Sequence, residues 1–96
     1  MENEIQVYGT DWCGLTHAVR EYLTNSRLAY DYVDIDRDAD AHRFVLAMND
    51  GRLRFPLVVV EHHVVPQPTV ATLQRVLGDH GIRPVVSTIA YPRTRL

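Results

Sequence analysis

A strand–helix–strand pattern over the first 35 residues is the feature that most constrains the fold. Residues 5–8 predict a short apolar strand, which the turn-forming Gly9-Thr10-Asp11 ends. A helix is expected to begin near Cys13 and to stop at Asn25-Ser26, and residues 28–35 predict a second strand. A helix that connects two strands in this way implies a parallel pair with a right-handed crossover. The expected inner stripe of this helix consists of Leu15, Val19, Tyr22 and Leu23.

The next segments predict a second helix and a hairpin. Asp38 is a suitable N-cap, and Asn49-Asp50-Gly51 is typical of a helix end. The nearly continuous apolar run of residues 56–60 predicts a strand that is buried on both faces. Residues 63–65 are expected to return as its antiparallel partner after a tight turn at Glu61-His62, which lacks the usual glycine or asparagine. The side chains expected on the inner side of the second helix are Phe44, Val45 and Met48.

Pro68 is expected at the first position of a last helix, which Gly78 and Gly81 end. The predicted order is therefore βαβαββα, an α/β fold with a four-stranded mixed sheet flanked by helices. A chain of 96 residues is long enough for one such domain and too short for two. We assign residues 1–81 to this domain and residues 82–96 to a C-terminal tail.

The composition argues against several classes of protein. A formal net charge of -2 gives no electrostatic footprint for nucleic acid or an anionic membrane. No apolar run is long enough to span a membrane, and the first residues carry no signal-peptide pattern, so we expect a protein of the reducing cytoplasm. A single cysteine forbids an intrachain disulfide and an all-cysteine zinc site within one chain. We expect a monomer with no bound metal.

Two segments that suggest metal ligands fail on their spacing. The acidic run of residues 34–40 is similar to a calcium loop, but Ala39 stands at the glycine position and Val45 at the required glutamate position. His62 and His63 are adjacent, and on strand-like backbone they are expected to point to opposite faces. Neither segment predicts a metal site.

Cys13 is the strongest candidate for a functional residue because it lies where the first strand gives way to a helix. A thiolate at a helix N-terminus is stabilised by free backbone N–H groups and by the positive end of the helix dipole. Thr16 stands where a second cysteine would complete a dithiol pair, so redox chemistry here is one-thiol chemistry. The alternative is that Cys13 is a small buried apolar residue without a reaction.

Three motifs, in this order of elements, resemble thioredoxin-fold proteins of the glutaredoxin class. They are residues 7–14 (VYGTDWCG), residues 30–36 (YDYVDID) and residues 54–56 (RFP). The likeness is closest to the mycoredoxins, actinobacterial relatives that reduce mixed disulfides of mycothiol, and it covers roughly residues 4–80.

The resemblance implies an oxidoreductase that acts on mixed disulfides between proteins and a low-molecular-weight thiol. The Cys13 thiolate would take up the small thiol and release the protein, and a second small thiol would regenerate the cysteine. Glutaredoxins usually carry a lysine just before the cysteine that contacts a glutathione carboxylate, but Thr10 falls there and the chain contains no lysine. Their paired glycines are also replaced, by residues 66–69 (PQPT). Mycothiol is therefore the more suitable co-substrate than glutathione.

Around the nucleophile Cys13, the Thr16 hydroxyl is expected to bond the thiolate, although an ordinary first-turn residue is the alternative. Trp12 would cover one side of the sulfur, and Gly14 would allow close approach of the substrate. Leu15, next in the motif, is a further candidate substrate contact.

The remaining candidate contacts come from two later segments. By resemblance, Pro56 is expected to be cis, so that the Phe55 backbone pairs with an extended thiol substrate. Thr69 and Val70 are expected at the N-terminus of the last helix, where they present N–H groups to a ligand or simply cap the helix. His17 shares the helix face of Cys13, where a protonated imidazole would help the thiolate, or is merely solvated.

Two other functions remain open at this point. Residues 13–16 (CGLT) resemble the Cys-Gly-Phe-Ser of monothiol glutaredoxins, which hold an iron–sulfur cluster between two subunits with glutathione. The third possibility is a redox-inactive thioredoxin-fold binding module, in which Cys13 no longer reacts and the tail recruits a partner.

Overall fold

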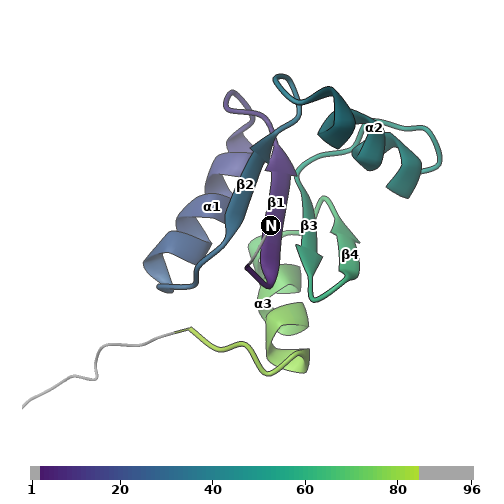
Figure 1. Cartoon of the computed structure of the whole chain (residues 1–96). Helices are drawn as coiled ribbons and strands as arrows, with labels where there is room; N and C mark the ends of the chain where they lie inside the picture. The colour runs from purple at the N-terminus through teal and green to yellow at the C-terminus, as the bar shows by residue number, and fades with distance from the viewer. Residues whose placement is uncertain (1–2, 85–96) are drawn as a thin grey trace, which may run out of the picture.

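A four-stranded sheet with the strand order β2-β1-β3-β4 forms the centre of the structure, a computed structural model in which residues 3–84 are described (Figure 1). β1 (Ile5–Gly9) pairs parallel with β2 (Asp31–Asp34) and antiparallel with β3 (Leu57–Val60). β4 (His63–Pro66) pairs antiparallel with β3 at the edge of the sheet. The sheet is thus mixed, as the sequence predicts.

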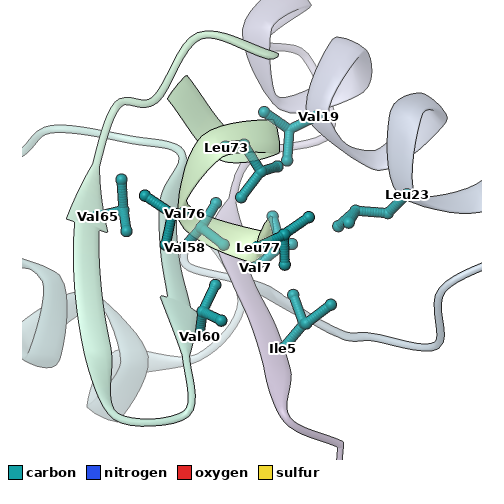
Figure 2. Close-up of a cluster of buried hydrophobic side chains, with 10 residues drawn as sticks. All are labelled: Ile5, Val7, Val19, Leu23, Val58, Val60, Val65, Leu73, Val76 and Leu77. Atoms are coloured by element: carbon teal, nitrogen blue, oxygen red, sulfur yellow. The ribbon is translucent and has the colours of Figure 1, made fainter. Parts of the chain in front are cut away.

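Three helices cover the two faces of this sheet: α1 (Gly14–Asn25), α2 (Ala39–Met48) and α3 (Val70–Asp79). The larger apolar cluster lies between the sheet and the pair α1 and α3, and Figure 2 shows its ten buried side chains converging from these elements. A smaller cluster joins α2 to the opposite face. The element order βαβαββα and the sandwich of helices around the sheet confirm the predicted fold class.

β3 links the two clusters because every one of its residues is buried. Val58 and Val60 point into the cluster shared with α1 and α3, whereas Leu57 and Val59 point into the cluster with α2. Alternating side chains of a strand face opposite sides of the sheet, so a strand with helices on both sides must be apolar throughout. The expectation of a strand buried on both faces is confirmed.

The helix ends largely follow the predicted signals. Asp38 is the N-cap of α2, where its carboxylate accepts a hydrogen bond from the Ala41 backbone N–H. The prediction for α3 was wrong by two residues: the helix begins at Val70, not at Pro68, because the Thr69 hydroxyl accepts from the Thr72 N–H and makes Thr69 the N-cap. The second strand is also shorter than predicted.

Two side chains expected in the core are exposed. Leu15 is 37% exposed and Met48 is 44% exposed. Each stands in a terminal turn of its helix. The buried residues of α1 are Thr16, Val19 and Leu23, and those of α2 are Ala41 and Val45. The helical period therefore predicted the buried side correctly in the middle of each helix, but in the first turn of α1 it is Thr16 and not Leu15 that is buried.

The turn between β3 and β4 places both Glu61 and His62 at positive φ, 47° and 75°. Such a turn matches the twist of a two-stranded hairpin, although glycine or asparagine is its usual occupant. His62 therefore lies in the turn and not on strand-like backbone beside His63, which corrects the sequence-based expectation. The Glu61 carboxylate contacts the Nδ1 of His80 at 2.8 Å, and His80 is the C-cap of α3.

Of the expected C-terminal tail, residues 85–96 lie outside the described residues. Within residues 3–84, no helix combines the length and the apolar character that crossing a bilayer requires.

Removing a side chain from the buried cluster between the sheet, α1 and α3 is expected to leave a cavity and to lower the stability of the protein. Leu23 is completely buried, so Leu23→Ala is expected to lower the free energy of unfolding by about 2–5 kcal/mol. Leu53→Ala is the control, because Leu53 is exposed, and it is expected to change stability by less than about 0.5 kcal/mol. Urea denaturation followed by circular dichroism measures both; equal midpoints for the two variants would contradict the packing described.

Candidate functional site

Cys13 lies between β1 and α1 and is the N-cap residue of α1. Its backbone is extended, with φ -88° and ψ 123°, and its carbonyl accepts the first helical hydrogen bond, from the His17 N–H at 3.1 Å. The cysteine is partly exposed and forms no disulfide. This placement leaves the free N–H groups of the first helical turn directed toward the sulfur side of the helix.

Two opposing influences decide the acidity of Cys13. Partial burial is the largest single influence and raises the pKa of the thiol. Hydrogen bonding to the sulfur from the Thr16 backbone N–H, the Thr16 hydroxyl and the Leu15 backbone N–H acts in the other direction. These donors together outweigh the burial, so the pKa of Cys13 lies below its ordinary value, and more of the sulfur is thiolate at neutral pH.

The Thr16 side chain is enclosed between Cys13 and the end of β1. Its hydroxyl is buried and has no hydrogen-bond partner of ordinary geometry among residues 3–84, yet it lies close enough to the sulfur to lower the Cys13 pKa. We interpret it as a donor that gains its full partner when the thiol ionises, because an anion is the stronger acceptor.

Gly9, the last residue of β1, makes room for this threonine. A Cβ atom at Gly9 would lie 2.6 Å from the Thr16 Oγ1 and 2.7 Å from its Cγ2. A residue with a side chain therefore does not fit without displacing Thr16. The sequence predicted a turn at Gly9 but not its contact with Thr16, because no local pattern shows which side chain lies against a glycine.

Trp12 is 70% exposed but is held by two contacts. Its Nε1–H donates to the Oδ2 of Asp36 at 2.8 Å, and its ring meets the Phe55 ring edge to face, with centroids 5.5 Å apart and planes at 88°. These contacts bring the loop that carries Cys13 together with the loop before α2 and the segment before β3. Trp12 and Phe55, two predicted site residues, are thus neighbours in space.

The Phe55–Pro56 peptide bond is cis, which confirms that expectation. Gln67, the residue after β4, bonds this segment twice: its backbone N–H donates to the Pro56 carbonyl at 2.8 Å, and its Nε2 donates to the Phe55 carbonyl at 3.3 Å. Gln67 adopts a positive φ of 43°. The sequence did not identify Gln67 as a site residue, because its contact with Phe55 joins segments that are 12 residues apart in the chain.

The remaining predicted contacts differ in what surrounds them. A Cβ atom at Gly14 would meet no described atom within 4 Å, so the space beside this residue is open. The Thr69 hydroxyl caps α3, and Val70 is the first residue of that helix. Thr10 is buried, so the position where glutaredoxins usually carry a lysine holds a small enclosed side chain here.

Of the two alternatives for His17, the structure favours the solvated one, because the side chain is exposed and does not contribute to the acidity of Cys13. The Nε2 of His17 contacts the backbone carbonyl of Asp11. The Asp11 carboxylate in turn accepts a hydrogen bond from the Tyr32 hydroxyl at 2.8 Å. Burial raises the pKa of Tyr32, and the adjacent Asp11 carboxylate raises it further, so the phenol stays a proton donor to Asp11 at neutral pH. Asp11 thus fastens the loop before Cys13 to both α1 and β2.

Among residues 3–84, His, Cys, Asp and Glu side chains form no group of three that is arranged to hold a metal ion. In the acidic segment after β2, Asp34 accepts a hydrogen bond from the Asp36 backbone N–H and pairs with Arg37 at 3.5 Å. These contacts order the loop and supply the carboxylate that binds Trp12.

Comparison with known proteins agrees with this geometry. The family model of glutaredoxins matches residues 5–65. The structure is similar to a crystal structure of the thioredoxin-like protein BC3987, with a TM-score of 0.68, 32% identity, and coverage of 76% of this chain and 99% of that one. It is also similar in fold to a glutaredoxin from Archaeoglobus fulgidus, with a TM-score of 0.65, 18% identity, and coverage of 79% and 87%. The fold is thioredoxin-like.

Two relatives show the same relationship in sequence. A candidate glutaredoxin of Mycobacterium tuberculosis strain H37Rv is 39% identical over 54 residues, which is 56% of this chain and 64% of the relative. Mycoredoxin 1 of Corynebacterium glutamicum is 32% identical over 56 residues, which is 58% of this chain and 68% of the relative. The matches thus span about two thirds of these relatives. The chain belongs to the glutaredoxin family.

The geometry around Thr16 predicts a change in thiol acidity. Thr16→Val keeps the shape of the side chain but removes the hydroxyl, so the pKa of Cys13 is expected to rise. The pH midpoint of thiolate absorbance at 240 nm and of alkylation by iodoacetamide should both move to higher pH. Thr24→Val is the control, because Thr24 is exposed in the last turns of α1 and contacts Tyr30. A midpoint unchanged in Thr16→Val would contradict the donor role.

The contact between Gly9 and Thr16 predicts a loss of stability. Gly9→Ala introduces a Cβ that overlaps Thr16, and overpacking of this kind costs about 1–3 kcal/mol. Gly14→Ala is the matched control, since its Cβ enters open space at the start of a helix, where alanine is preferred over glycine by at most about 1 kcal/mol. Thermal denaturation should therefore separate the two variants in opposite directions, and a neutral Gly9→Ala would show that Thr16 is not confined.

Proposed function

We propose that this protein is a monothiol thiol–disulfide oxidoreductase that removes a low-molecular-weight thiol from proteins. The observation that carries the proposal is the lowered pKa of a partly exposed Cys13 at a helix N-terminus. A thiolate that is both stabilised and accessible is the form that attacks a disulfide. Membership of the glutaredoxin family supports the same chemistry.

The reaction consists of two thiol–disulfide exchanges. The Cys13 thiolate attacks the sulfur of the small thiol in a protein mixed disulfide; a Cys13–small-thiol disulfide forms, and the protein thiolate leaves and takes a proton. A second small-thiol anion then attacks that disulfide, which releases the symmetrical small-thiol disulfide and the Cys13 thiolate. The second small thiol is the reductant, supplying the electrons that the protein thiol gains. With Thr16 in place of a second cysteine, the cycle uses Cys13 alone.

Mycothiol is the small thiol that the site favours over glutathione. Thr10 is buried where a lysine would reach a glutathione carboxylate, and the chain has no lysine at all. The similarity to mycoredoxin 1 supports the same choice.

The proposed activity lies within residues 1–81, which contain all seven elements of the fold. Cys13 is the proposed nucleophile and Thr16 its hydrogen-bond donor. Trp12 and Phe55 supply an aromatic surface beside the nucleophile, on which the small thiol would lie. The other proposed substrate contacts are Gly14, Leu15, Pro56, Thr69 and Val70.

A mixed-disulfide reduction assay tests this function. With free mycothiol as reductant, the protein is expected to catalyse reduction of the mixed disulfide of mycothiol and 2-mercaptoethanol to 2-mercaptoethanol and mycothiol disulfide, with kcat/KM at least about tenfold higher than for the glutathione counterpart, a difference of about 1.4 kcal/mol. Cys13→Ser should lower the rate to that of the uncatalysed exchange. Mass spectrometry of the wild type stopped during turnover should detect mycothiol on Cys13.

Three outcomes would contradict parts of this proposal. Equal use of glutathione would refute the choice of small thiol. A complete lack of turnover with an unshifted Cys13 pKa would refute the enzyme and favour a binding module. A brown protein after anaerobic purification, with absorbance lost in Cys13→Ser and no turnover, would favour an iron–sulfur carrier.

A further inference from the structure

The Trp12 side chain is held by more contacts than is usual for a side chain that is so exposed. An exposed side chain normally loses rotamer freedom only when it gains compensating contacts. Trp12 has two directional ones, the 2.8 Å hydrogen bond from its Nε1 to the Oδ2 of Asp36 and the edge-to-face contact with Phe55. The two partners come from separate loops, so the indole spans the gap between them in a single orientation.

Asp36 is ordered independently of the tryptophan. Its backbone N–H donates to the Oδ1 of Asp34 at 2.9 Å. The Arg37 backbone N–H donates to the Asp34 carbonyl at 3.1 Å, and the Arg37 side chain pairs with the Asp34 carboxylate. The backbone of the loop at Asp36 is therefore held by contacts that do not involve Trp12, and the Asp36 carboxylate on this loop binds the indole.

Phe55 is held from its own side. Its carbonyl accepts from the Gln67 side chain, and the next carbonyl, of Pro56, accepts from the Gln67 backbone. Its ring packs against the apolar cluster beneath α2. Trp12 therefore lies between a carboxylate on an ordered loop and the Phe55 ring, directly next to Cys13 in the chain.

We propose that Asp36 is a positioning residue that holds the Trp12 indole against Phe55, and that this aromatic pair determines how well a small-thiol disulfide binds at Cys13. The second half of this statement rests on the proposed function; the first half does not. Asp36 acts on substrate binding and not on the nucleophile, because the influences on the Cys13 pKa come from its burial, Thr16 and Leu15. The carboxylate is exposed, so its removal leaves the core intact.

Trp12 is the only tryptophan of the chain, so its fluorescence reports directly on this contact. In Asp36→Ala, the anisotropy of Trp12 is expected to fall and its quenching by acrylamide to rise, because the indole gains rotamers. Asp36→Asn retains an acceptor oxygen and should restore most of the wild-type signal. Asp40→Ala is the matched control: it removes an equal charge from the same acidic segment, where the Asp40 carboxylate pairs with Arg43 on its own helix.

The kinetic test uses the mixed disulfide of mycothiol and 2-mercaptoethanol. Asp36→Ala should raise KM about fivefold with little change in kcat or in the Cys13 pKa, whereas Asp40→Ala should match the wild type. Anisotropy and quenching in Asp36→Ala equal to those of Asp40→Ala would overturn the positioning role. A mobile indole with an unchanged KM would overturn the role of the pair in binding. Absence of turnover in the wild type would refute the proposed function, while the fluorescence would still decide whether Asp36 holds Trp12.

Discussion

The close approach of Gly9 to Thr16 is the contact on which the rest of the site depends. It joins the end of β1 to the first turn of α1 at a distance that only a glycine permits. Because that turn is fixed against the strand, Cys13 stands at the helix terminus with the Leu15 and Thr16 donors beside its sulfur. A strand followed by a crossover helix is a general feature of the fold. Here the absence of a side chain at Gly9 leaves room for Thr16, and Thr16 in turn lowers the pKa of Cys13.

The acidity of Cys13 is achieved here without a cationic side chain. The donors that lower its pKa are two backbone N–H groups and one hydroxyl. Such donors act on a thiolate at short range and carry no net charge, so added salt screens them far less than it would screen a lysine or an arginine. The chain contains no lysine that could stand near the cysteine, which is one reason for proposing a co-substrate without carboxylates.

The elements that follow from local chemistry could be predicted from the sequence. The apolar run of β3, the Asp38 cap and the cysteine between β1 and α1 each depend on residues close in the chain. The cis bond at Pro56 came from family resemblance, since its residue type alone makes trans the expected form. The bond from Trp12 to Asp36 and the two bonds of Gln67 could not be predicted, because each joins segments that meet only after the sheet has formed.

The hairpin tip between β3 and β4 illustrates a conflict between backbone and side chain. Asn-Gly at positions 61 and 62 would relax the left-handed backbone of this turn. It would also delete the carboxylate of Glu61 that meets His80 at the end of α3. The edge hairpin and the last helix are thus fastened together at the pole of the molecule remote from Cys13. A redesign that replaced Glu61 to improve the turn would therefore remove a contact between the hairpin and α3. Residues 61, 62 and 80 would have to be changed together to keep the two elements attached.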